Sequence, residues 1–379
     1  MNLRFFCSCL ASILTITTFC VTNGFSQVNQ VSFEDSGWDF SHAVESRVED
    51  YKGRKSLYLE GKAFFDKADF SDGVVEVDVT TPFPRAFAGI LFRTQSPTEY
   101  EEMYIRLHKS GSPDAIQYTP VFNNIAAWQL YGPGDGWGMT AFDRNEWIPL
   151  RIEFSGDHVS IFAGQSNDPV LETRLRREDE SGSLGLWALF GSYFSNFRYS
   201  QKDTPAEIMS EPRPDEGVIT NWNLSKAFRA VDVNLTEPPS TGNSDWSEIK
   251  SESNGLVNLS RYLPEEDFRN MPDDGDFDAG QSAIGTYANA TITSDSDQVK
   301  KLQFGYSDNV VILLNGKPIF TGESGFRARD PLFQGMIGYH DAVFLDLKEG
   351  DNELIFVVTE TFGGWGLMAK FEDVTGITF

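Results

Sequence analysis

The chain has 379 residues and a formal net charge of −25 at pH 7. An acidic chain is a poor partner for nucleic acid, because phosphate binding needs a basic footprint. Acidity spread along a sequence is typical of a soluble, self-repelling surface, so we expect no nucleic-acid ligand.

The first residues predict an export signal. Arg4 precedes an apolar run over residues 5–21, and small or polar residues follow it. This pattern is typical of a secretory signal peptide, here residues 1–26, with cleavage after Gly24 or Ser26. The run is too short and too rich in threonine to span a bilayer, and no later segment has the roughly 20 apolar residues that a membrane helix needs. We therefore expect a secreted protein, periplasmic or extracellular, with no membrane span.

The cysteines support the same interpretation. Cys7, Cys9 and Cys20 are the three cysteines of the chain, and all lie within the expected signal. The remaining chain therefore has no disulfide, no thiolate nucleophile and no cysteine metal site, and must depend on its core for stability. Phe19 disfavours lipidation of Cys20, because a small residue is expected at that position.

Residues 27–203 alternate short apolar and polar runs between Gly, Pro, Asp and Asn residues, which is typical of a β-sandwich. In the run from Val74 to Val79, three valines would face a core, while Glu76 and Asp78 would face the other side. Similar runs predict strands at residues 87–92, 103–107, 150–154, 159–162 and 184–189.

Residues 204–215 combine prolines and charges without a hydrophobic period, which predicts a linker. In the second half, residues 216–379, alternation predicts a strand from Phe228 to Leu235. Asn315 and Gly316 predict a hairpin turn, since both tolerate positive φ. A similar turn is expected over residues 349–352. The sequence thus predicts an all-β chain with two antiparallel β-sandwich (jelly-roll) domains in tandem, residues 27–203 and 216–379.

The acidic stretch of residues 271–280 is expected to be an exposed loop. Its aspartates suggest a structural Ca²⁺ as an open alternative, but the glycine and glutamate of an EF-hand are missing. Zinc is not expected, because the four histidines show no HxH or HExxH spacing. We predict no cofactor.

Four stretches of the first half resemble the concanavalin A-like lectin/glucanase superfamily, in particular laminin-G-like and keto-glycoside-hydrolase-type modules. They are YKGRKSLYLEG at residues 51–61, DGVVEVDV at 72–79, GILFR at 89–93 and WIPLRIEF at 147–154, and LGLWALFGSYFSNFRY at 184–199 is similar to the closing strands of such domains. These are mostly fold-determining positions, so the resemblance implies architecture more than activity. It also implies that ligands bind on the concave sheet.

The second half is similar to the galactose-binding-type jelly roll. SDNVVILLNG at residues 307–316, LKEGDNELIFVV at 347–358 and GGWGLMAKFED at 363–373 carry this likeness. Such domains accompany glycosidases, and the resemblance implies either sugar binding or packing against a neighbour.

The richest candidate site lies between Tyr100 and Tyr131. If Met103, Ile105 and Leu107 face the core, alternate residues project together from the opposite face. Aromatic rings cover the apolar face of a pyranose, while amides and guanidinium groups bind its hydroxyls or a carboxylate. The predicted ligand-binding residues are Arg93, Glu102, Tyr104, Arg106, His108, Gln117, Asn123, Trp128 and Tyr131. The alternative is an ordinary solvated sheet face.

Catalysis remains an open alternative, although a binding protein is favoured. Tyr104, Arg106 and His108 have the groups for β-elimination on an acidic polysaccharide. Glycoside hydrolysis needs two carboxylates roughly 5 to 10 Å apart, and the ExDxxE strand of jelly-roll glucanases is missing. No GxSxG elbow, P-loop or dinucleotide fingerprint occurs. No catalytic residue is assigned.

Trp137 and Trp365 lie between glycines, so they are secondary candidates for sugar stacking. The favoured function is recognition of a complex polysaccharide outside the cytoplasm through the predicted sheet face, with an acidic polysaccharide as an open alternative. The alternatives are a glycoside hydrolase or polysaccharide lyase using the same face, and a surface scaffold or adhesion protein without sugar chemistry.

Overall fold

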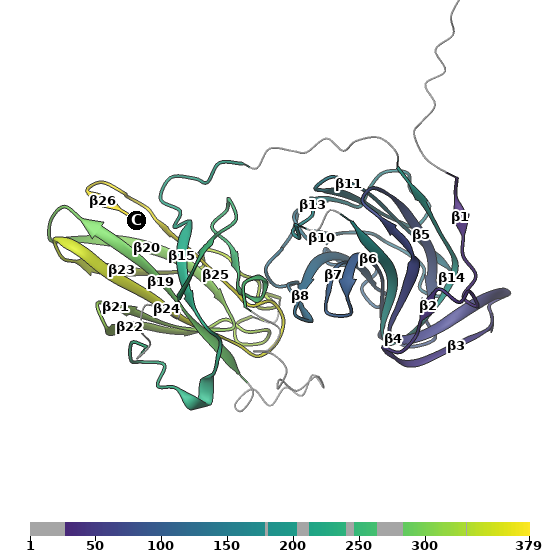
Figure 1. The fold of residues 1–379 in the computed structure, drawn as a ribbon, viewed down its shortest axis with the longest axis horizontal. Helices are drawn as coiled ribbons and strands as arrows, with labels where there is room; N and C mark the ends of the chain where they lie inside the picture. Colours follow the sequence, from purple (N-terminus) through teal and green to yellow (C-terminus); the bar gives the residue numbers. More distant parts are fainter. Residues whose placement is uncertain (1–26, 179–180, 203–211, 240–245, 264–282, 331) are drawn as a thin grey trace, which may run out of the picture.

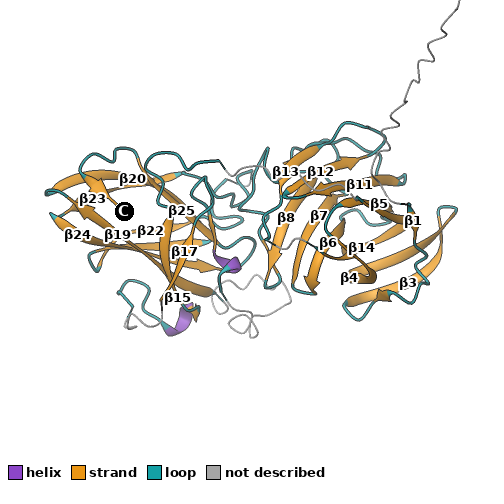
Figure 2. Ribbon diagram, turned by 45° about the horizontal axis from the view of Figure 1, so that its top comes forward, coloured by secondary structure: helices purple, strands orange, loops and turns teal. Residues whose placement is uncertain are grey.

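The computed structural model describes residues 27–178, 181–202, 212–239, 246–263, 283–330 and 332–379. Within these ranges strands dominate, and helix is confined to short 3-10 turns (Figure 2). The strands form two bodies (Figure 1), which we call the N-terminal part (residues 29–201) and the C-terminal part (residues 221–378).

The N-terminal part is one continuous antiparallel sheet folded into two layers. Its strands are β1 (Asn29–Gln30), β2 (Trp38–Asp39), β3 (Ala43–Tyr51), β4 (Arg54–Phe70), β5 (Gly73–Thr80), β6 (Phe87–Ser96), β7 (Glu99–Arg106), β8 (Ile116–Phe122), β9 (Ile125–Ala126), β10 (Trp137–Gly138), β11 (Ile148–Ser155), β12 (His158–Ala163), β13 (Leu171–Arg174) and β14 (Gly182–Gln201).

The long strand β14 connects the two layers. Its first half pairs with β6, and its second half pairs with β5. Between these halves, Phe190 and Gly191 have positive φ values of 67° and 71°, and the pairing with β4 shifts register. A bulge bends the strand that carries it, so this irregularity lets one strand contribute to both layers.

The core of this part lies between the layers. Val75, Val77 and Val79 of β5 are buried there, opposite Met103 and Ile105 of β7. The acids that alternate with the valines are on the outer side, where Glu76 binds Arg198 and Asp78 binds Arg54. The alternation predicted for this strand is confirmed.

The C-terminal part has an eight-stranded and a four-stranded sheet. The eight-stranded sheet contains β15 (Asn221–Ser225), β16 (Phe228–Arg229), β17 (Trp246–Lys250), β19 (Ile284–Ser294), β21 (Asn309–Leu314), β22 (Lys317–Glu323), β24 (Gly350–Glu360) and β26 (Ile377–Thr378). The four-stranded sheet contains β18 (Val257–Asn258), β20 (Gln298–Ser307), β23 (Asp341–Leu347) and β25 (Gly366–Phe371). Two 3-10 turns are described, η1 (Ala230–Asp232) and η3 (Leu259–Arg261).

The hairpin predicted at Asn315 and Gly316 is confirmed. It joins β21 to β22, and the two residues have φ values of 51° and 75°. The turn at residues 349–352 has a different role from the one predicted, because β23 and β24 belong to different sheets. It carries the chain across the sandwich rather than closing a hairpin.

The strand predicted from Phe228 to Leu235 is wrong. Only Phe228 and Arg229 pair as β16, and η1 follows. The alternation has another cause: Phe228, Val233 and Leu235 pack onto the outer face of the eight-stranded sheet, against Val311 and its neighbours. The apolar alternation of this stretch therefore comes from a segment that covers the outer face of the sheet, and not from a strand.

The all-β class with antiparallel sandwich sheets is confirmed. The predicted signal (residues 1–26), most of the predicted linker and the acidic loop of residues 271–280 lie outside the described residues. No helix in the described ranges is long and apolar enough to cross a membrane.

Candidate functional site

A row of paired residues crosses five strands of the layer that holds β7. Lys62 of β4 pairs with Trp187 of β14, and Trp187 pairs with Gly89 of β6. Gly89 in turn pairs with Tyr104 of β7, and Tyr104 pairs with Gln117 of β8. Residues paired across antiparallel strands share a face, so this row lies on one side of the layer. That side is opposite the core.

Neighbouring rows complete this surface. Leu91, Glu102 and Thr119 form the row on one side, and Phe87 pairs with Arg106 on the other. We call the surface the Tyr104 face and define it by these side chains: Lys62, Phe87, Leu91, Glu102, Tyr104, Arg106, Gln117, Thr119 and Trp187. The alternation predicted for β7, with Met103 and Ile105 in the core and the polar residues opposite, is confirmed.

Aromatic rings form the centre of the Tyr104 face. The rings of Tyr104 and Trp187 lie 5.4 Å apart at 68°, and Phe87 lies 6.1 Å from Tyr104 and 6.3 Å from Trp187. Gly89 makes this approach possible, because a Cβ atom there would lie 2.8 Å from the Cβ atom of Tyr104. The glycine thus leaves room between two large rings.

Polar groups on this face are buried without full hydrogen bonding. Tyr104 donates its hydroxyl proton to Gln117 Oε1. Gln117 Nε2, Glu102 Oε1 and Arg106 Nε have no hydrogen-bond partner among the described residues. Glu102 is 4% exposed and Gln117 is 1% exposed. Buried polar atoms are nearly always paired in folded proteins, so three such atoms on two adjacent strands are unusual.

Arg106 is paired at its other end. Its Nη1 group donates to Asp114 Oδ2 in the loop before β8. Gln334 of the C-terminal part also donates to Asp114 Oδ2, at 3.4 Å. Both parts of the chain therefore contribute to the end of the Tyr104 face that holds Arg106.

Burial changes the acid–base behaviour of this face. It raises the pKa of the Glu102 carboxyl to about 8, an effect that the charge of Lys62 opposes. Burial, followed by the charge of Glu102, raises the pKa of Tyr104 above its usual range. Burial also lowers the pKa of His108, and the charge of Arg106 acts in the same direction. At neutral pH the face therefore presents a protonated carboxylic acid and a neutral imidazole.

His108 lies at the edge of this face. It follows the end of β7, with Nδ1 3.2 Å from the carbonyl oxygen of Ala86 and its ring 5.0 Å from Phe87. Five of the nine predicted site residues are thus close together: Glu102, Tyr104, Arg106, His108 and Gln117.

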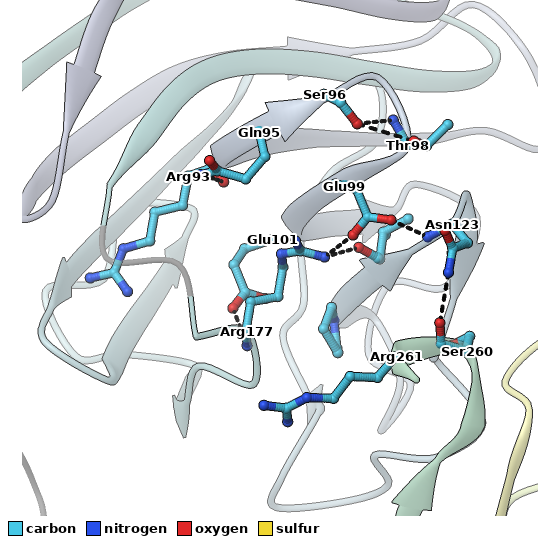
Figure 3. Close-up of polar contacts among 12 residues, drawn as sticks. Arg93, Gln95, Ser96, Thr98, Glu99, Glu101, Asn123, Arg177, Ser260 and Arg261 are labelled. Atoms are coloured by element: carbon cyan, nitrogen blue, oxygen red, sulfur yellow. Dashed lines mark hydrogen bonds and ion pairs between the residues drawn. The ribbon is translucent and has the colours of Figure 1, made fainter. Parts of the chain in front are cut away.

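Asn123 is not on the face, and its predicted place there is corrected. It lies in the turn after β8 with a φ of 54°, and its Nδ2 group donates to the carbonyl oxygens of Ser260 and Leu263 at 2.9 and 2.7 Å. Its backbone N–H donates to Glu99, which also binds Arg177 (Figure 3). The turn directs this side chain to the C-terminal part, where it joins the two parts.

Trp128 and Tyr131 are corrected for the same reason. The Trp128 ring packs against Phe326 and Phe362 of the C-terminal part, at 5.8 and 6.1 Å. The buried Tyr131 donates its hydroxyl proton to Glu252 Oε1 at 2.6 Å. Both residues follow β8 in a loop, where the strand alternation used in the prediction no longer applies.

Arg93 is also placed elsewhere. It has a φ of 46°, which turns the end of β6 away from the Tyr104 face. Its Nη2 group donates to the carbonyl oxygens of Ser71 and Gly156 at 2.9 and 2.6 Å, and its guanidinium lies over the Phe154 ring. Figure 3 shows it directed away from Glu99 and Asn123. Arg93 is a structural residue of the opposite side.

The two loop tryptophans differ from each other. Trp365 is fully buried in the core of the C-terminal part, so its predicted role in sugar stacking is wrong. Trp137 lies in β10 beside Gln117 and is half-buried. In the described part of the chain, no group of three or more His, Cys, Asp or Glu residues is arranged to hold a metal ion.

The prediction missed Trp187, Asp114 and Gln334. Trp187 had a usable signal, because LGLWALF alternates and puts the tryptophan opposite the buried Leu186 and Ala188. Asp114 lies in a loop, and Gln334 comes from the other part of the chain, so no local pattern in the sequence indicates either one.

No protein-family model matches this sequence, and no curated protein matches it. Among solved structures, the chain is similar to the carbohydrate binding module CBM66 from Bacillus subtilis, with 19% identity, a TM-score of 0.35, and coverage of 44% of this chain and 96% of that one. It is also similar to SCLam, a non-specific endo-β-1,3(4)-glucanase from family GH16, with 13% identity, a TM-score of 0.34, and coverage of 47% and 91%.

A third similar structure is the κ-carrageenase from Pseudoalteromonas carrageenovora in complex with an oligotetrasaccharide of κ-carrageenan. The identity is 12%, the TM-score is 0.33, and the alignment covers 50% of this chain and 99% of that one. At these identities and TM-scores, the likenesses carry no argument about what this chain binds.

Proposed function

We propose that this protein binds a carbohydrate on the Tyr104 face. The observation that carries the proposal is the group of buried atoms without partners in the described ranges: Glu102 Oε1, Arg106 Nε and Gln117 Nε2. An unpaired buried polar atom costs about 1–3 kcal/mol. A ligand rich in hydroxyl groups would supply these partners, because each hydroxyl both donates and accepts.

The aromatic residues support a sugar in particular. Tyr104, Trp187 and Phe87 place three rings beside the unpaired atoms. A pyranose has an apolar C–H face that packs on an aromatic ring and a rim of hydroxyl groups that need hydrogen bonds. Trp187 is half-buried, so its ring is accessible from the face.

We further propose the organisation and location in which this binding takes place. Residues 27–203 would form the lectin-like domain, and residues 216–379 would form a second jelly roll that packs against it. The apolar leader of residues 1–26 favours export, and an exported binder would meet polysaccharides outside the cytoplasm.

Two variants test the proposal. Glu102→Leu and Gln117→Leu each remove an unpaired polar atom and keep a similar volume, so the protein should stay folded and lose affinity for the glycan. Glu153→Leu, on β11 in the other layer, is the matched control. The measurement is affinity electrophoresis of the purified protein against neutral and acidic polysaccharides. Undiminished binding by both Tyr104-face variants would contradict the proposal, and no binding to the whole panel would favour the scaffold alternative.

A second candidate function is hydrolysis of a glycosidic bond. It is favoured by Glu102, whose pKa of about 8 keeps the carboxyl protonated at neutral pH, as a general acid requires. In this case the same samples would contain shortened chains, and Glu102→Gln would abolish shortening while leaving binding. Binding without shortening at any pH from 5 to 8 would exclude this function for the polysaccharides used.

A further inference from the structure

We infer that the Tyr104 face selects uncharged sugar residues and that Asp114, held by Gln334 of the C-terminal part, is the specificity-determining residue that disfavours acidic ones. This inference rests on the proposed glycan-binding function.

Arg106 places a positive charge on the Tyr104 face. The Arg106 side chain belongs to the buried rows of the face and is 9% exposed. Its Nη1 group is already bound to the carboxylate of Asp114, which is 3% exposed. A uronate or sulfate would therefore approach a guanidinium whose charge Asp114 already compensates. The anion would also lie beside the buried carboxylate of Asp114.

Glu102 lies on the same strand as Arg106. Its unpaired Oε1 atom lies two rows from Arg106, on the same side of the layer. A carboxyl group in either protonation state can bind a hydroxyl group, since it accepts when ionised and also donates when protonated. A carboxylate ligand would instead be repelled whenever Glu102 is ionised. At neutral pH the Glu102 carboxyl is protonated, so Asp114 is the acid of the face that disfavours an anion.

Two other cations are Lys62, which belongs to the face, and Arg85 at its edge, and both are engaged in other contacts. Lys62 donates to the carbonyl oxygen of Pro97 and to Asn124 Oδ1. Arg85 stands over the rings of Phe87 and Phe190 at the exposed edge, where water solvates its charge. The exposed charge of Arg85 contributes little to selectivity at physiological salt, and the half-buried Lys62 is held by its two hydrogen bonds, so the buried pair of Arg106 and Asp114 dominates.

Gln334 makes the C-terminal part a contributor to this specificity. Its Nε2 group donates to Asp114, while its carbonyl oxygen accepts from Gln129 Nε2 of the N-terminal part at 3.0 Å. Two hydrogen bonds therefore hold Gln334 to the N-terminal part, one to Asp114 and one from Gln129. We assign Gln334 as a positioning residue, which acts through Asp114.

The test compares each neutral polysaccharide that the purified protein binds with its own derivative oxidised at C6 to the uronate. We expect the oxidised form to bind at least about tenfold more weakly, because a charge-assisted contact replaced by repulsion is worth more than about 1.4 kcal/mol. Asp114→Asn removes the charge that compensates Arg106. The ratio of the affinity for the neutral form to the affinity for the oxidised form should therefore fall by about tenfold, chiefly through tighter binding of the oxidised form. Gln334→Leu should shift the ratio in the same direction by a smaller factor.

The control is Asp72→Asn, which makes the same charge change beside another buried arginine, Arg93, 3.6 Å away on the opposite side. It should leave the ratio unchanged. Wild-type preference for the oxidised form would overturn the inference while leaving glycan binding in place, and so would an unchanged ratio in both folded Asp114 and Gln334 variants. If Asp114→Asn does not fold, Gln334→Leu decides alone. Absence of binding to every neutral polysaccharide would overturn the proposed function and the inference with it.

Discussion

Gln129 and Gly364 connect the two parts of the chain through one hydrogen bond. The Oε1 atom of Gln129 accepts from the backbone N–H of Gly364 at 3.0 Å, while its Nε2 group donates to the carbonyl oxygen of Gln334. The backbone carbonyl of Gln129 also accepts from Ile337. One fully buried residue thus satisfies three backbone groups of the C-terminal part.

This connection predicts that Gln129→Leu destabilises the protein and uncouples its two parts. The substitution leaves the Gly364 N–H and the Gln334 carbonyl without their partner, at a cost of about 2–4 kcal/mol. Differential scanning calorimetry should show a lower first transition and a separation into two transitions. Gln95→Leu, which changes an exposed amide of β6, is the control. A single transition at the wild-type temperature would show that the contact does not couple the parts.

A second prediction concerns pH and Glu102. Burial raises the pKa of this carboxyl to about 8, so the folded protein keeps a proton that the unfolded chain releases near pH 4.5. Stability from this group is therefore fully present below about pH 4.5 and is lost as pH rises to about 8. Glu102→Gln should remove this loss, which we expect to be on the order of 4 kcal/mol between pH 5 and pH 8.

The measurement is urea unfolding of wild-type and Glu102→Gln protein at pH 5 and pH 8. Other buried acids, such as Glu101 and Glu252, titrate in both proteins and cancel in the comparison. Parallel pH profiles for the two proteins would show that Glu102 has an ordinary environment.

A third prediction concerns Glu360 at the end of β24. It is 2% exposed, and neither carboxylate oxygen has a hydrogen-bond partner within the described part of the chain. Burial, together with the charge of Asp308, raises its pKa well above the usual range, an effect that the nearby backbone N–H of Phe362 opposes. Glu360→Leu should therefore raise the free energy of unfolding at pH 7 by about 1–3 kcal/mol.

Urea unfolding at pH 7 checks this expectation, with Glu248→Leu as the control, because Glu248 is exposed on β17. A decrease in stability comparable with the loss of a buried hydrogen bond would mean that Glu360 has a partner that stabilises it.

Sequence alternation predicted the parts of this fold in which strands pair regularly. Val75, Val77 and Val79 are buried as expected, and so are Met103 and Ile105 opposite the polar residues of β7. Period-two alternation has this power because burial of one face fixes the register of the strand. The five site residues on or next to β7 and β8 were predicted on the same basis.

The prediction failed where the chain leaves the strands. Asn123, Trp128 and Tyr131 follow β8, and their contacts are with residues more than 100 positions away, such as Ser260 and Glu252. The same holds for Gln334, which reaches Asp114 from the other part of the chain. Such contacts depend on how the N-terminal and C-terminal parts pack, which has no periodic signal in either sequence segment.

The most direct test of the Tyr104 face observes the Gln117 side-chain amide by NMR. Selective ¹⁵N labelling of glutamine gives few signals, and loss of one pair of signals in Gln117→Leu assigns the Nε2 group. Because Nε2 has no partner among the described residues of the free protein, addition of a bound polysaccharide should shift this pair strongly and slow its exchange with water. Unchanged Gln117 signals under conditions in which the polysaccharide is bound would contradict the account and place the binding site elsewhere.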